Sequence, residues 1–123
     1  MRPDKAQDVL EMPNYSPIEA TRYFHVPLST LLYWTEANHL VTLPSVRPKM
    51  LSFKNLVEFY VLEGLRKIHK VKTQQIRAAV DYLLSSEKSR HPLADYDLQT
   101  EGKNIVFYRD GKPLNVSISG QFE

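Results

Sequence analysis

The 123-residue sequence contains no cysteine, which excludes disulfide bonds and thiolate metal sites. It has only four glycines and no glycine-rich loop that could cradle a phosphate. No apolar run reaches the roughly 18 residues that a membrane-spanning helix needs, and the first residues lack the apolar core of a signal peptide. These absences favour a cytoplasmic protein that does not enter a membrane.

The residue patterns of catalysis and metal binding are also missing. The chain has four histidines, His25, His39, His69 and His91. They are far apart in the sequence and show no metal-ligand spacing, and there is no nucleophile elbow. Asp95 and Asp97 lie close together, but two carboxylates in a polar stretch are usually solvated loop residues. The sequence therefore predicts no enzyme, no metal and no cofactor.

Net charge is small, at a formal +2, yet the basic side chains are concentrated in one part of the chain. Residues 47–77 hold eight lysines and arginines against two glutamates. A clustered basic surface is typical of proteins that bind polyanions such as DNA. The alternative is an ordinary solvated face of two helices, which is our interpretation of Arg66, Lys67 and Arg77.

The stretch 15–34 predicts two short helices that meet at a tight corner. Ser16 is a suitable N-cap, Pro17 stands in the favoured first helical position, and Glu19 completes a capping box. Pro27 disfavours helical conformation in the residue before it, so the first helix must end by that point.

The second helix is predicted to begin at Ser29, whose hydroxyl suits a cap, and to bury Leu31 and Trp34. Its other side would present Ser29, Thr30 and Tyr33. A helix, a short turn and a second helix form the unit that places its second helix in the DNA major groove. Two alternatives remain: any small helical domain contains such a corner, and Tyr33 could be partly buried.

The residues after this helix pair predict a small hairpin. Leu40–Leu43 is strand-like, and Pro44 and Pro48 suit an exposed loop between short edge strands. Arg47 and Lys49 near the tip would form a wing that contacts phosphates beside the groove.

Two longer helices are predicted next, and they should pack on the helix pair and close its core. Ser52 caps the third helix, which runs to about His69, and Thr73 caps a fourth that ends near Ser86. The helical apolar positions of the third are Phe53, Leu56, Val57, Tyr60, Val61, Leu65 and Ile68.

A second hairpin is predicted from Asn104–Tyr108 and Leu114–Ser119, because Asp110-Gly111 is a strong turn signal. The expected cross-strand pairs are Phe107 with Leu114 and Ile105 with Val116. One face of this hairpin is therefore apolar. Since a lone hairpin is marginal in water, it must pack on the helical core or pair with another subunit, and we favour a role in a homodimer.

The expected fold is mainly α with a small β component. Residues 1–14 form an N-terminal arm, residues 15–86 a winged helix-turn-helix with a four-helix core, and residues 87–123 a loop and C-terminal β-hairpin that serves as a dimerisation element.

Several stretches carry a family resemblance. They are Tyr15–Ala20, Val26–Trp34, Leu51–Leu56 and Val71–Arg77, with weaker matches at His91–Leu93, Thr100–Gly102 and Gly120-Gln121. Over residues 15–84 the chain resembles the MerR-type winged helix-turn-helix. Over residues 15–121 it is similar to the N-terminal DNA-binding domain of VapB-type antitoxins.

The resemblance implies a dimeric antitoxin that binds double-stranded DNA, represses its own operon and holds a PIN-domain (VapC-type) toxin. Leu32 stands where the family usually has an arginine, so base reading falls to Ser29, Thr30 and Tyr33. The expected phosphate contacts are the helix start at Ser16 and the side chains Arg22, Arg47, Lys49, Lys54, Lys70 and Lys72. The alternative function is a protein-interaction module, a degenerate helix-turn-helix that binds a toxin or other partner without DNA.

Overall fold

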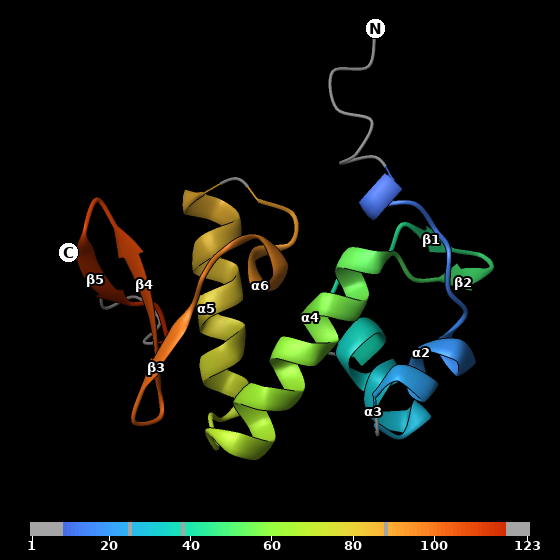
Figure 1. The fold of residues 1–123 in the computed structure, drawn as a ribbon, viewed down its shortest axis with the longest axis horizontal. Coiled ribbons are helices and arrows are strands. Elements are labelled where there is room, and N and C mark those ends of the chain that lie inside the picture. The colour runs from blue at the N-terminus through green and yellow to red at the C-terminus, as the bar shows by residue number, and fades with distance from the viewer. Residues whose placement is uncertain (1–8, 25, 38, 88, 118–123) are drawn as a thin grey trace, which may run out of the picture. The chain divides into compact units, whose positions relative to one another are not determined.

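A computed structural model describes residues 9–24, 26–37, 39–87 and 89–117, and the chain divides into two compact units, residues 1–60 and 61–123 (Figure 1). Elements that begin in the first unit are the helices α2 (Pro17–Tyr23), α3 (Leu28–Leu32) and α4 (Phe53–Glu63), the π-helical turn η1 (Tyr33–Ala37), and the strands β1 (Ser45–Val46) and β2 (Lys49–Met50). The second unit contains the π-helical turn η2 (Gly64–Ile68), the helices α5 (Thr73–Ser86) and α6 (Pro92–Asp95), and the strands β3 (Gln99–Glu101), β4 (Asn104–Arg109) and β5 (Lys112–Asn115).

The expectation of a mainly helical chain with a small β part is confirmed. The domain limits at residues 14 and 86 stay predictions.

The predicted capping box opens α2. The Ser16 hydroxyl accepts from the Glu19 N–H at 3.2 Å, and the Glu19 carboxylate accepts from the Ser16 N–H at 2.8 Å. The predicted N-cap of the second helix, Ser29, is wrong by two residues. Pro27, with φ −61°, stands in the N-cap position of α3, and its carbonyl accepts from the N–H groups of Thr30 and Leu31. Ser29 therefore lies inside the first turn and caps nothing.

The aromatic core of the first unit forms around Trp34 and Phe59. The rings of Trp34 and Phe59 are stacked with centroids 5.8 Å apart, and Phe24 meets Phe59 edge to face at 6.2 Å. Leu31 and Trp34 are both buried, as predicted. The chain then folds back over the end of η1, because Leu40 and Val41 donate their N–H groups to the Trp34 carbonyl. These two residues are buried in a loop, so the strand-like reading of residues 40–43 was wrong.

A hairpin is present here, but its first strand lies later than predicted, because residues 40–43 are a loop and β1 forms within the expected loop of residues 44–48. Strands β1 and β2 are antiparallel, with Ser45 opposite Met50 and Val46 opposite Lys49. Arg47 and Pro48 form the connecting turn. The hairpin is short, which fits strands flanked by prolines.

Only part of the apolar stripe predicted for α4 is buried. Phe53 and Tyr60 are 46% and 70% exposed, whereas Leu56, Phe59 and Leu62 are buried. The helix carries two overlapping apolar stripes, and packing selects the one that contains Phe59. Ile68 of η2, also expected in the core, is 74% exposed.

The second unit contains a three-stranded antiparallel sheet in the order β3-β4-β5. Phe107 lies opposite Leu114, which confirms the predicted register, and the turn residues Asp110 and Gly111 have φ values of 53° and 78°, as a tight hairpin turn requires. Strand β3 was not predicted, because its three residues are polar and its pairing with β4 is made only in the folded chain.

The apolar face of this sheet is covered within the chain by α5 and the segment that follows it. Phe107 is buried, with its ring 5.3 Å from that of Tyr96. Arg109 lies over the Tyr82 ring of α5 at 5.8 Å, and it donates to the Tyr82 hydroxyl and to the Glu87 carboxylate. The Glu87 contact raises the pKa of the Arg109 guanidinium, with a further contribution from Tyr82. Of the two expectations for the hairpin, packing on the chain's own helix is confirmed, and its use in a dimer stays a prediction.

We expect Tyr96 to make the stability of the second unit depend on alkaline pH. Burial raises the pKa of its phenol above the ordinary 10.0, and the charges of Glu87 and Asp95 raise it further. The unfolded chain therefore loses this proton first, so the stability due to Tyr96 is present below pH 10 and falls as the pH rises through the folded-state pKa. In urea titrations, we expect the unfolding midpoint to decline above about pH 10 and to decline less in Tyr96→Phe. An equally steep decline in the variant would contradict this assignment.

Candidate nucleic-acid interface

The second helix of the α2–α3 pair presents polar side chains on one side and core residues on the other. Ser29 is exposed, and Tyr33, four residues later, is 48% exposed, so the tyrosine is not packed inside the unit. Thr30 is only half-buried. Leu31 and Trp34 anchor the opposite side in the core. The arrangement leaves a hydroxyl and a phenol on a helix whose orientation is set by buried neighbours.

The hairpin β1–β2 lies beside the end of η1. The Lys49 ammonium is 2.6 Å from the Glu36 carboxylate, and only 19% of the lysine side chain is exposed. Arg47 is exposed at the turn. A cavity of about 390 Å³ lies here, lined by Thr35, Glu36, His39, Val41, Thr42, Leu43, Val46 and Lys49. The ion pair joins the hairpin to the helix and compensates the Lys49 charge, so Arg47 is the hairpin cation most available to an anion.

Asn55 positions the loop that leads into this hairpin, and the sequence did not single it out. Its side chain is fully buried. Its carbonyl oxygen accepts from the Ser52 N–H at 2.9 Å, and its amide donates to the Thr42 carbonyl at 3.0 Å and to a Glu58 carboxylate oxygen at 2.9 Å. The one available signal was the three-residue spacing from Ser52, whose hydroxyl accepts from the Asn55 N–H in return.

The other expected phosphate contacts of the first unit differ in their availability. Arg22 is exposed in the last turn of α2. Lys54 is only 9% exposed and lies 3.5 Å from the Glu11 carboxylate, so its charge is compensated within the chain. The Ser16 N–H already donates to Glu19, which places a carboxylate at that helix start. Arg22 and Arg47 are thus the exposed cations among the positions predicted in this unit.

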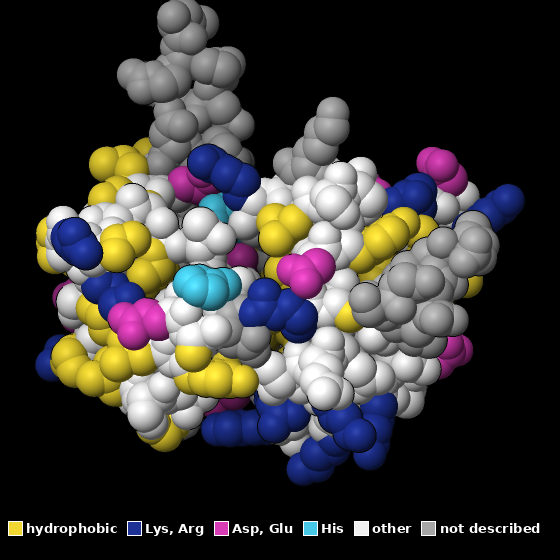
Figure 2. All heavy atoms as spheres, turned by 180° about the vertical axis from the view of Figure 1, so that it is seen from behind, with side chains coloured by type: hydrophobic (Ala, Val, Ile, Leu, Met, Phe, Trp, Pro, Cys, Tyr) yellow, Lys and Arg dark blue, Asp and Glu magenta, His cyan; other side chains and the backbone are white. Residues whose placement is uncertain are grey.

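Lys70 and Lys72 belong to the second unit, where both are exposed in the turn between η2 and α5. Arg66 and Lys67 are exposed in η2, just before this turn. Arg66 donates to the Val71 carbonyl at 2.8 Å. Figure 2 shows lysine and arginine side chains gathered along the lower edge, where Figure 1 places this turn. The second-unit part of the predicted basic cluster is therefore exposed around this turn, whereas Lys49 and Lys54 of the first unit are ion-paired.

Among residues 9–24, 26–37, 39–87 and 89–117, no three His, Asp or Glu side chains come together as metal ligands. In the same part of the chain, no helix combines the length and the apolar character needed to cross a bilayer.

Comparison with known proteins shows a similarity to a protein named as an antitoxin. The chain is 29% identical over 113 residues to a protein of Mycobacterium tuberculosis H37Rv named "Putative antitoxin VapB45". The match covers 79% of this chain and 46% of the relative, so the chain spans less than half of that protein's length. No family model matches the chain, and no solved structure matches it significantly. The similarity supports the expected relationship to VapB-type antitoxins, and the MerR-type winged helix-turn-helix stays a prediction.

Proposed function

We propose that this chain is a DNA-binding antitoxin that represses its own toxin–antitoxin operon. The observation that carries the DNA-binding part is the exposed pair Ser29 and Tyr33 on a helix anchored by buried Leu31 and Trp34. A helix whose inner side is held in a core and whose outer side carries hydrogen-bonding groups is suited to reading base edges. The antitoxin part is supported by the similarity to a protein that bears that name.

In this proposal α2 and α3 form a helix-turn-helix and the β1–β2 hairpin is its wing. Ser29, Thr30 and Tyr33 contact base edges, with Thr30 contributing less because it is half-buried. The hairpin lies at the end of η1, joined to it by the Lys49–Glu36 ion pair, so Arg47 is carried next to the reading helix. A cation at that place would contact the phosphates that flank the groove.

In the first unit, the phosphate contacts of this proposal come from Arg22 and Arg47. Lys70 and Lys72, which are exposed in the second unit, stay predicted phosphate contacts. Lys54 is left out because it is buried beside Glu11. A homodimer would double these contacts and match a palindromic operator. The proposed protein partner is a VapC-type PIN-domain toxin.

The test is binding of the full chain to a labelled duplex from the DNA upstream of its own gene, followed by fluorescence anisotropy. A scrambled duplex of equal length and composition is the control. We expect tighter binding to the upstream duplex, and a loss of affinity of at least about tenfold between roughly 50 and 200 mM salt, because counterions are released from the phosphates. Equal affinity for both duplexes, or no binding at the lower salt, would reject the DNA-reading role.

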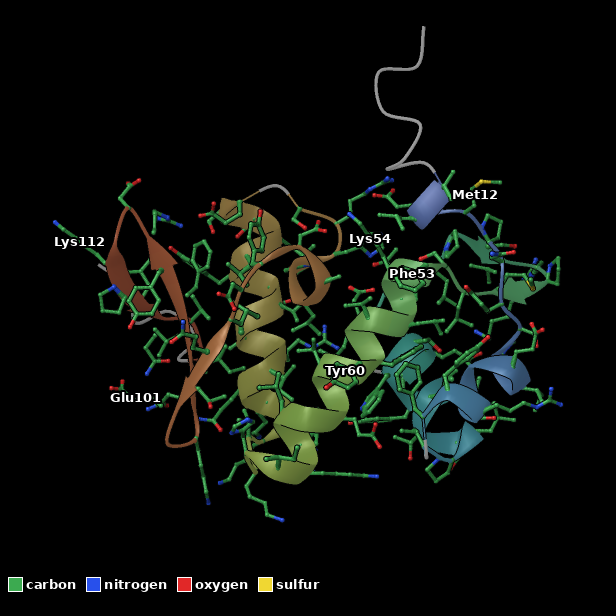
Figure 3. The ribbon with its side chains drawn as sticks, in the orientation of Figure 1. Met12, Phe53, Lys54, Tyr60, Glu101 and Lys112 are labelled. Carbon is green, nitrogen blue, oxygen red and sulfur yellow. The ribbon has the colours of Figure 1, made fainter. Side chains whose placement is uncertain are left out.

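Arg47→Ala is expected to weaken binding to both duplexes alike and to lower the slope of log affinity against log salt by about 0.9, the value for one phosphate contact. Lys112→Ala is the matched control, since it removes an exposed cation of β5, labelled in Figure 3, that is not among the proposed contacts. If both variants changed the slope equally, the assignment of Arg47 to a wing would be wrong.

The second candidate is a partner-binding module that does not use DNA. It is favoured by the compensated charges of Lys49 and Lys54, two lysines that the sequence assigned to phosphates. Under this alternative the chain binds the toxin but neither duplex, so the same anisotropy experiment separates the two functions.

A further inference from the structure

The first unit contains an apolar groove between α2 and α4 that the DNA-binding proposal does not use. Its volume is about 350 Å³, and its lining residues are Tyr15, Tyr23, Phe24, Phe53, Leu56, Val57 and Tyr60. The rings of Tyr15 and Tyr23 meet edge to face with centroids 5.9 Å apart. Phe53 and Tyr60 are carried by α4 and are labelled in Figure 3.

The exposed apolar area of this groove is substantial but too small for a stable dimer. Tyr23, Phe53 and Tyr60 are 63%, 46% and 70% exposed. If each aromatic side chain offers about 200 Å², the three present roughly 350 Å² to solvent. A stable interface between two proteins buries about 800 Å² on each side. The groove therefore fits a short peptide segment better than a second copy of the chain.

The chemistry of the lining indicates what kind of segment it accepts. Among the residues that the structure describes, no charged side chain lines the groove, so the bound segment must be uncharged at its centre. The hydroxyls of Tyr15, Tyr23 and Tyr60 make no hydrogen bond to any described residue. They are consequently available to donate to a ligand.

Because the groove combines phenol hydroxyls with an apolar lining, it suits an extended segment better than a helix. The carbonyl groups of an α-helix are already bonded within the helix, so only its side chains could use these donors. A polyproline II segment has no internal hydrogen bonds, exposes its carbonyls and packs its pyrrolidine rings on aromatic faces. We propose that this groove binds an extended, proline-containing segment of a partner protein.

Binding at this groove goes beyond DNA recognition, because Ser29 and Tyr33 do not line the groove. Peptide binding to the groove can therefore be tested without DNA. The ¹⁵N-labelled full chain is titrated with a nine-residue peptide, capped at both ends, in which prolines occupy two of every three positions and alanine the third. The matched peptide carries alanine throughout. We expect saturable chemical-shift changes of groove residues with the proline peptide at up to about millimolar concentration, and none that saturate with the alanine peptide.

Variants of one groove tyrosine and one distant tyrosine give the residue-level test. Tyr60→Phe removes a single hydroxyl and should weaken binding of the proline peptide about three- to tenfold, as loss of one hydrogen bond does. Tyr60→Ala should abolish saturation, and it is tolerable because the side chain is 70% exposed. Tyr108→Phe, an exposed tyrosine of β4, should leave the affinity unchanged.

Three outcomes would overturn the proposal. One is that the proline peptide causes no groove shifts, and another is that a leucine-rich amphipathic helical peptide binds the same residues more tightly. The third is that the groove signals change with protein concentration alone, which would mean that a second copy occupies the groove. Anisotropy of Tyr60→Phe with the upstream duplex, expected to equal that of the unaltered chain, keeps failure of this proposal distinct from failure of DNA binding.

Discussion

Replacing Phe59 by alanine is expected to lower the free energy of unfolding by about 3–5 kcal/mol. Phe59 is 1% exposed and lies at the centre of the aromatic core, stacked on Trp34 and in edge-to-face contact with Phe24. Its removal leaves a cavity that these two rings cannot fill without losing their own contacts. Because small proteins are stable by only about 5–15 kcal/mol, a loss of this size would be visible at once in urea titrations.

The neighbouring residue supplies the control for this prediction. Tyr60 also carries an aromatic ring on α4, but it is 70% exposed, so Tyr60→Ala should change the free energy of unfolding by no more than about 1 kcal/mol. Trp34 is the only tryptophan and is stacked on Phe59, so its fluorescence reports the first unit directly. Similar losses in the two variants would mean that the core is not centred on Phe59.

Asn55→Ala is expected to cost about 2–5 kcal/mol, although only a polar side chain is removed. The substitution leaves the Ser52 N–H, the Thr42 carbonyl and a Glu58 carboxylate oxygen without the bonds that Asn55 makes. Ser52 and Glu58 are both 1% exposed, so water cannot replace their lost bonds without opening the structure, whereas the Thr42 carbonyl belongs to an exposed residue.

Asn14→Ala is the matched control for Asn55→Ala, because Asn14 is exposed and should tolerate the change within about 0.5 kcal/mol. Urea midpoints and slopes of the two variants, measured by tryptophan fluorescence, give the comparison. A midpoint for Asn55→Ala equal to that of the unaltered chain would show that the loop before the hairpin does not depend on this network.

The elements that could be predicted from sequence are those whose signals are local. The capping box of Ser16 and Glu19 and the turn at Asp110-Gly111 each depend on residues within one turn of chain, and both were correct. The start of α3 was misplaced because Pro27 and Ser29 are both suitable residue types for a helix start. Which of them caps the helix depends on the carbonyl that accepts from the Thr30 and Leu31 N–H groups, and that carbonyl belongs to Pro27.

The sequence predicted which residues of the candidate site are exposed or buried, but not which of its lysines are ion-paired. Tyr33 is exposed and Trp34 buried, as the helical period indicated. The pairing of Lys49 with Glu36 and of Lys54 with Glu11 could not be foreseen, because each joins residues that are distant in the chain. Charge counts treat every lysine as available, whereas folding compensates some of them.

By itself the sequence determined the helix and hairpin signals, the absence of cysteine chemistry and the concentration of basic residues between 47 and 77, since all of these follow from residue type and spacing. Only the tertiary structure decided which stripe of α4 is core. The helical pattern favoured the stripe of Phe53 and Tyr60, but Phe59 is the residue that contacts Trp34 and Phe24. The stripe left outside became the aromatic groove, because a helix with two apolar stripes can bury only as much of its surface as its neighbours cover.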